Sequence, residues 1–224
     1  MMYDYLSDLS LPELSSQNLG RSDEYLYAAL SSSSHALAAP TRASKTGFLT
    51  SSVGLATLIL IRALQHHQSH SHRQSGSKYQ ALADTWPSSI KVLNSALQLA
   101  VESRLAESDD GCEVLYGRAG LLYALLRLRS ELDRIASSSR SPAANPSVVA
   151  ALQPLVTDAV FSELVDIIVQ RGKNGSAAYA TGLTSAAEPG SVPALMWSWL
   201  GKRYLGGAHG VGMYVPRCRL RSVY

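Results

Sequence analysis

The stretch CEVLYGRAGLLYALLRLRSELDRIA, residues 112–136, combines a glycine-bearing turn with a long helical pattern. Gly117 and Gly120 lie near its start, and apolar side chains then recur at spacings of three and four residues. Such spacing places these side chains on one face of a helix. The face consists of Leu121, Leu125, Leu128, Leu132 and Ile135. We therefore predict an amphipathic helix over residues 117–137.

The same periodicity recurs along the chain, whereas the alternation typical of strands is almost absent. A long helix is predicted to begin at Val148 and to stop at Gly172, because glycine commonly ends helices. A loop rich in glycine, serine and alanine is expected over 172–191. The other predicted helices cover residues 22–38, 47–64 and 88–106. The sequence thus predicts an all-α fold.

The order of the elements narrows this prediction. Three times, an amphipathic helix is followed by a turn that contains glycine and then by a more apolar segment. The turns contain Gly54, then Gly117 with Gly120, then the glycines of residues 206–212. Glycine allows two backbones to approach closely. We expect an array of helical hairpins with amphipathic helices outside and apolar helices inside.

Composition excludes several classes of protein. Of 224 residues, 46% are hydrophobic and 17% charged, which excludes a chain that is disordered throughout. The net charge of +3 is too small to indicate a nucleic-acid partner. Two cysteines form no disulfide framework, so reduced thiols in the cytoplasm are expected. Leu55–Leu64 is shorter than the roughly 20 residues that cross a bilayer and is predicted to be a buried helix.

Two segments resemble motifs of one family. Residues 112–126 resemble the Leu-Tyr-Gly-Arg-Ala-Gly turn of lanthionine synthetase C-like proteins. Residues 196–210 resemble another motif of the same family, in which a Trp-x-x-Gly-Lys-x-Tyr-Leu-Gly stretch leads into Ala-His-Gly. Thr46–Gly54 is similar to a degraded form of that family's first glycine repeat, with Ser51 where glycine is usual. The segments occur in the family's order. The resemblance implies an α/α-toroid, here a partial one of about three helical hairpins.

This resemblance divides the chain into three parts. Residues 1–21 are expected to be an N-terminal extension, 22–212 a partial toroid domain and 213–224 a tail outside the family sequence. The tail is set apart because Pro216 interrupts the apolar helix expected there.

The resemblance also implies a chemistry. Intact relatives use zinc to activate a thiol, from glutathione or a peptide cysteine, and add it to a dehydroamino acid in a peptide. The thiolate is the nucleophile, and metal coordination deprotonates the thiol near neutral pH. An acid must then protonate the enolate carbon. Partners of this chain would be such a thiol and such a peptide, in the cytoplasm, with plasma-membrane association left open by the resemblance.

Three residues match positions of the family motifs. His209 corresponds to the Ala-His-Gly histidine and is a candidate catalytic proton donor; the alternative is a histidine that caps a glycine turn. Glu113 is a candidate catalytic acid, where bacterial relatives carry an aspartate, or else an ordinary acid at a helix entry. Arg118 is a candidate for binding a substrate carboxylate or phosphate, or else covers a helix end.

Zinc ligands are the missing part of this pattern. Relatives bind zinc through two cysteines and a histidine, in motifs well downstream of Ala-His-Gly. Cys218 stands too early and in a different setting, and Cys112 is interpreted as a small buried side chain. The histidines His66, His67, His70 and His72 are interpreted as part of a polar loop. We therefore expect no metal site in this chain and a truncated, catalytically incomplete protein.

Two other functions stay open. The first is an interaction or scaffold protein that keeps part of the toroid without catalysis. The second, more distant, is a relative of six-hairpin glycosidases, which need a pair of carboxylates flanking the scissile bond. Glu113 with Asp109 or Asp110 does not establish such a pair from sequence alone.

Overall fold

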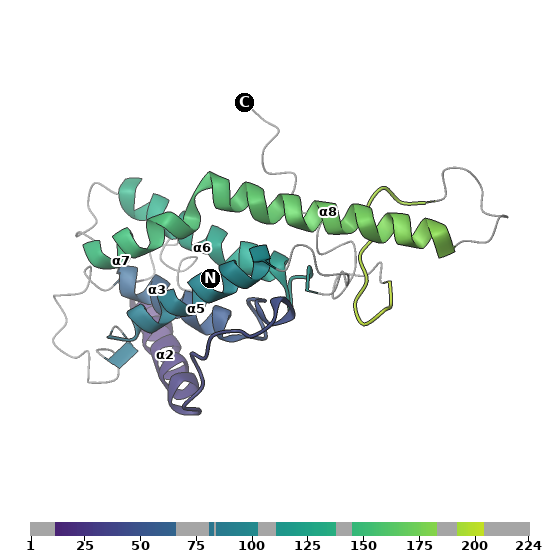
Figure 1. Ribbon diagram of the computed structural model, residues 1–224. Helices are drawn as coiled ribbons and strands as arrows, with labels where there is room; N and C mark the ends of the chain where they lie inside the picture. Colours follow the sequence, from purple (N-terminus) through teal and green to yellow (C-terminus); the bar gives the residue numbers. More distant parts are fainter. Residues whose placement is uncertain are drawn as a thin grey trace.

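A computed structural model describes residues 12–65, 81–82, 84–102, 111–137, 145–182 and 192–203, with side chains from residue 21 onward (Figure 1). Helices dominate these ranges, and no strand occurs in them beyond one isolated pairing of Trp199 with Lys202. The prediction of an all-α fold is confirmed.

The described helices run in the following order. They are α2 (Pro12–Ser31), the 3-10 helix η1 (Ala43–Lys45), α3 (Ser52–Gln65), α5 (Trp86–Glu102), α6 (Arg118–Ser137), α7 (Pro146–Leu152), the 3-10 helix η4 (Gln153–Val156) and α8 (Asp158–Gly182). The helix predicted over 117–137 corresponds to α6, which begins one residue later, at Arg118, and ends at Ser137 as predicted. The helix predicted over 22–38 instead begins at Pro12 and ends at Ser31.

The prediction of a single helix from Val148 to Gly172 is wrong at both its middle and its end. The run is bent by 40° between Val156 and Asp158. Pro154 lacks the N–H that an α-helix needs, and Thr157 is extended, with its hydroxyl accepting from the Val160 N–H at 3.3 Å. Thr157 thus caps a new helix, which continues through Gly172 as far as Gly182.

A main hydrophobic core lies between α3, α5 and α6, and α7, η4 and α8 cover it (Figure 1). The fully buried leucines of this core are Leu60, Leu64, Leu93, Leu121, Leu125, Leu128, Leu152 and Leu164. The helix α3 is apolar because it packs against α2 on one side and α5 with α6 on others. The prediction that Leu55–Leu64 is a buried helix is confirmed for most of its side chains, with Leu58 exposed.

No helix in the described ranges is by itself both long and apolar enough to cross a membrane. The bent run from Pro146 to Gly182 is long and apolar enough only when its two parts are taken together. Buried core helices of other proteins can have the same length and composition.

An ion pair joins α2 to α3. The Arg62 guanidinium donates to both carboxylate oxygens of Asp23, at 2.6 Å from Nε and 2.8 Å from Nη2. The two side chains are only 11% and 16% exposed. This pair explains why an arginine lies within an otherwise apolar helix.

Asp23→Ala is expected to lower the free energy of unfolding by about 2 kcal/mol, because it leaves a largely buried guanidinium without its carboxylate. Urea unfolding followed by circular dichroism measures this. Glu24→Ala, at the exposed neighbouring position, is the matched control and should change stability by less than about 0.5 kcal/mol. Equal effects of the two variants would contradict the prediction.

Candidate functional site at the glycine turns

The three motif segments meet at Tyr116. The backbone N–H groups of Thr46 and Gly47 both donate to the Tyr116 carbonyl oxygen, each at 3.1 Å. The Tyr116 ring stacks on Trp199, with centroids 4.9 Å apart and planes within 6°. In Figure 1 the segments before α3 and α6 and the yellow-green residues 192–203 lie toward the same side. Segments far apart in the sequence therefore form one site.

Glycines permit this assembly. A Cβ atom at Gly120 would lie 2.1 Å from the Val114 carbonyl oxygen and 2.7 Å from the Gly47 Cα atom. A Cβ atom at Gly117 would lie 2.1 Å from the Gly111 carbonyl. All three obstacles are backbone atoms, which cannot move aside as a side chain can. Gly120 is thus needed where two turns pack on each other, and Gly117 where its own turn folds back on Gly111.

Arg118 is fully buried at the start of α6. Its Nε donates to the Ala100 carbonyl oxygen at 2.9 Å and its Nη1 to the Gly111 carbonyl oxygen at 3.2 Å. Ala100 belongs to the last turn of α5, so the guanidinium covers that helix end, as one of the two sequence interpretations proposed. In this arrangement its cation faces carbonyls of the protein, and contact with a substrate stays a prediction.

The surroundings of Arg118 are charged and polar. Burial lowers the pKa of the Arg118 guanidinium, the nearby Cys112 thiol raises it, and the Arg171 cation lowers it. The Cys112 sulfur lies 4.0 Å from Nη1. Cys112 is 1% exposed and packs with Ala119, Ile168 of α8 and Trp197, so its interpretation as a small buried side chain is confirmed.

Glu113 lies in the same turn and is 1% exposed. Its carbonyl oxygen accepts from the Gly117 N–H at 2.9 Å, which closes the turn before α6. An ordinary acid at a helix entry would lie in solvent, where its charge is hydrated. Glu113 is instead enclosed by protein. Its role in proton transfer stays a prediction.

Sequence reasoning missed Arg171, which is 4% exposed on α8 and close enough to Arg118 to act on it electrostatically. A signal for it exists in the sequence. The buried face of α8 includes Leu164, Ile168 and Gly175, and Arg171 falls on the same face at helical spacing. A charged residue on an apolar helix face indicates a buried electrostatic partner or site.

His209, the predicted proton donor, lies outside the described residues. So do the residues that the sequence offered as alternatives and that were not assigned to a site, which are Cys218, Asp109, Asp110, His66, His67, His70 and His72. In the part of the chain that the structure does describe, no group of three histidine, cysteine, aspartate or glutamate side chains is arranged to hold a metal ion.

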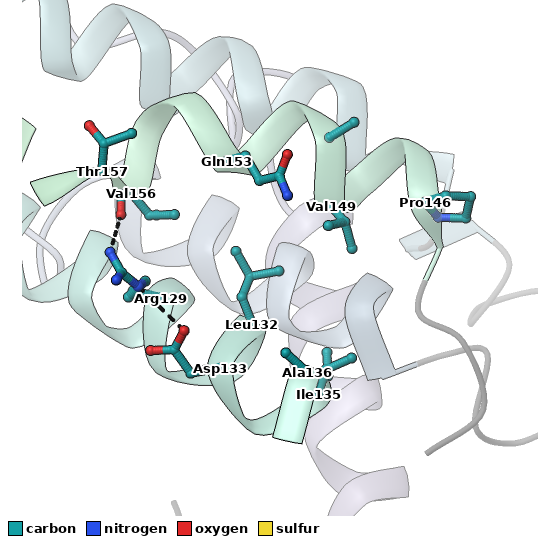
Figure 2. A pocket seen from close by; sticks show the side chains of 11 residues that line it. Arg129, Leu132, Asp133, Ile135, Ala136, Pro146, Val149, Gln153, Val156 and Thr157 are labelled. Carbon is teal, nitrogen blue, oxygen red and sulfur yellow. Dashed lines mark hydrogen bonds and ion pairs between the residues drawn. The ribbon is translucent and has the colours of Figure 1, made fainter. Parts of the chain in front are cut away.

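A separate groove of about 710 Å³ lies between the C-terminal half of α6 and the α7–η4 run (Figure 2). Leu132, Ile135 and Val149 give it an apolar floor. At its rim Arg129 donates to the Val156 carbonyl oxygen at 2.8 Å and to Asp133 at 3.4 Å. The groove is at the other end of α6 from the glycine turns, so it does not contain the candidate residues.

No protein-family model matches the chain, and no solved structure matches it significantly.

Proposed function

We propose that this chain is part of a lanthionine synthetase C-like protein and that its helices form part of an α/α-toroid. The observation that supports the proposal is the meeting of the three motif segments at Tyr116, whose carbonyl accepts from Thr46 and Gly47 and whose ring stacks on Trp199.

The reaction proposed for the intact protein is addition of a thiol, from glutathione or a peptide cysteine, to a dehydroamino acid in a peptide. In that reaction His209 is the candidate donor of the proton to the enolate carbon, and Glu113 is the candidate second acid. The hydrogen bonds of Arg118 join the turn that holds Glu113 to the end of α5. A fixed acid is what proton transfer to a defined atom requires.

Zinc, which the resemblance implies, does not fit the residues described. Among the described residues the thiol is Cys112, but its sulfur lies 4.0 Å from the Arg118 guanidinium, and a second cation at that position would be repelled. We therefore assign no ligand to zinc and propose that this chain is catalytically incomplete.

A non-catalytic interaction protein is the second candidate, and one observation favours it. Glu113 and Arg118 are enclosed in the protein rather than lining a cleft, at 1% and 0% exposure. Buried charged groups with internal partners are as typical of structural clusters as of active sites. Under this second proposal the protein has the same helical fold but catalyses no thiol addition.

The full chain, purified with added zinc and incubated with glutathione and a dehydroalanine-containing peptide, is expected to add glutathione no faster than the reaction without protein. Mass spectrometry of the peptide and metal analysis of the protein measure this. Stoichiometric zinc with accelerated addition would overturn the proposed incompleteness.

Two variants then test the residue assignments. If addition is accelerated, Glu113→Gln and His209→Asn should each lower the rate by roughly 100-fold, the usual contribution of general acid catalysis. Unchanged rates in both would reject the assigned roles. The family itself is tested separately by the genomic sequence downstream of this chain. Cys-His-Gly motifs there would support the family, and their absence would count against it.

A further inference from the structure

The groove between α6 and the α7–η4 run has two walls with the same spacing of lining residues (Figure 2). On α6 the lining residues include Arg129, Leu132, Asp133 and Ala136. On the α7–η4 run they include Pro146, Val149, Ala150 and Gln153. In each set the later residues follow the first by three, four and seven positions, a spacing that places side chains on one face of a helix. Each wall of the groove is therefore a single helical stripe.

The apolar part of the groove lies away from Arg129. Leu132, Ile135 and Val149 pack against the outer edge of the main core and are only partly buried. Ala136 and Ala150 beside them are exposed, and their small side chains leave the space between the two stripes open. A continuous apolar surface of this kind is typical of a place where a partner binds.

The spacing of the two stripes suits a third helix. The side chains of a helix form ridges at spacings of three and four residues, and helices pack by placing the ridges of one in the grooves of another. Two stripes that have this spacing and lie on either side of a groove accept one apolar ridge. Helices that bind in such grooves are anchored by residues at i, i+3, i+4 and i+7.

The charges at one end of the groove favour a basic helix. The Arg129 guanidinium donates to the Val156 carbonyl oxygen at 2.8 Å, and the carboxylates of Asp133 and Asp158 lie farther away, at 3.4 Å and 3.5 Å. Both carboxylates are well exposed, at 67% and 63%. The N-terminus of α8 contributes only about half a positive charge. Two accessible carboxylates beside one guanidinium attract a cation more than an anion.

We propose that this groove binds an amphipathic helix of a partner protein, with apolar side chains between Leu132 and Val149 and a lysine or arginine beside Asp133. Burial of the apolar side chains supplies the affinity. The ion pair at the groove's end sets the direction in which the helix lies. The proposal does not depend on thiol addition, and it gives the kind of partner that a non-catalytic interaction protein would have.

The test selects helical peptides that bind the full chain. The probe is a displayed library of alanine-based helices about five turns long, in which apolar, basic, acidic and uncharged polar residues are allowed at the other positions. The proposal expects selected peptides to carry apolar residues at spacings of three and four, and a lysine or arginine near one end. Fluorescence anisotropy of a labelled selected peptide then measures its affinity.

Two variants place a longer neutral side chain in the groove, one from each wall. Ala136→Gln and Ala150→Gln change exposed positions, so the fold should be retained, and each should weaken peptide binding by roughly 10-fold. Ser137→Gln, at the exposed position next to Ala136, is the matched control and should leave the affinity unchanged. Circular dichroism checks that all three variants are folded.

A second pair of variants tests the charge. Asp133→Asn should weaken binding by roughly threefold, the usual contribution of an exposed ion pair. Asp166→Asn removes the same charge from an exposed position of α8 outside the groove and should have no effect. An effect of Asp166→Asn equal to that of Asp133→Asn would reject the assigned ion pair.

Several results would overturn the proposal as a whole. These are a library that yields no binder, selected peptides rich in acidic residues, and binding that neither Ala136→Gln nor Ala150→Gln weakens. Sedimentation equilibrium of the chain alone gives a further check. A dimer that Ala136→Gln dissociates would mean that a second copy covers the groove, and it would also overturn the proposal.

Discussion

Gly120→Ala is expected to lower the free energy of unfolding by about 3 kcal/mol or more. The added methyl group would lie 2.1 Å from the Val114 carbonyl oxygen and 2.7 Å from both the Gly47 Cα and the Phe48 nitrogen. All three obstacles belong to the backbone of the two packed turns. Accommodating the methyl group therefore means separating the turns, which breaks the hydrogen bonds from Thr46 and Gly47 to Tyr116.

Urea unfolding of the purified variant, followed by circular dichroism, measures this loss. Gly182→Ala is the matched control, because nothing lies within 4 Å of its Cβ position. It should change stability by less than about 0.5 kcal/mol. A Gly120→Ala protein that unfolds at the same urea concentration as the unchanged chain would show that the turns are not packed as described.

Arg118→Met is expected to lower the free energy of unfolding by about 2–3 kcal/mol. Methionine fills much of the same volume, but it leaves the carbonyl oxygens of Ala100 and Gly111 without the donors that Nε and Nη1 now supply. Arg118→Lys should recover only part of the loss, because a single ammonium group does not reproduce the planar geometry of the guanidinium.

Thermal and urea unfolding test this prediction. Lys91→Met, at an exposed position of α5, is the control for replacing a cation by methionine, and its effect should stay below about 0.5 kcal/mol. A small effect of Arg118→Met would mean that the guanidinium does not fix the α5 end, and it would return Arg118 to its alternative role in contacting a ligand.

The helices of the main core could be predicted because their apolar spacing is local. The face of α6 that includes Leu121, Leu125 and Leu128 is the face that packs against α3. The end of α8 could not be predicted in this way. Glycine is a common helix terminator, but in the interior of a helix it costs only about 1 kcal/mol. At Gly172 the Trp197 ring, distant in sequence, occupies the space a side chain would take.

The site was predictable in part. The spacing of Gly117 and Gly120 indicated close backbone approach, and the structure confirms it. The burial of Glu113 and Arg118 was not predictable, because a buried charge depends on partners elsewhere in the chain. For Arg118 these are the end of α5 and Arg171 of α8. Sequence alone does not bring those elements together.

The contacts around Tyr116 also determine when the candidate site can form while the chain is being synthesised. The hydroxyl of Thr50 donates to the Leu115 carbonyl oxygen across 65 residues of sequence, and the stacking partner Trp199 comes later still. Contacts between distant residues form only after a large loop has closed. A chain leaving the ribosome can therefore build the main core from α3, α5 and α6 before Trp199 has been translated. Residues 192–203 then pack onto helices that are already in place.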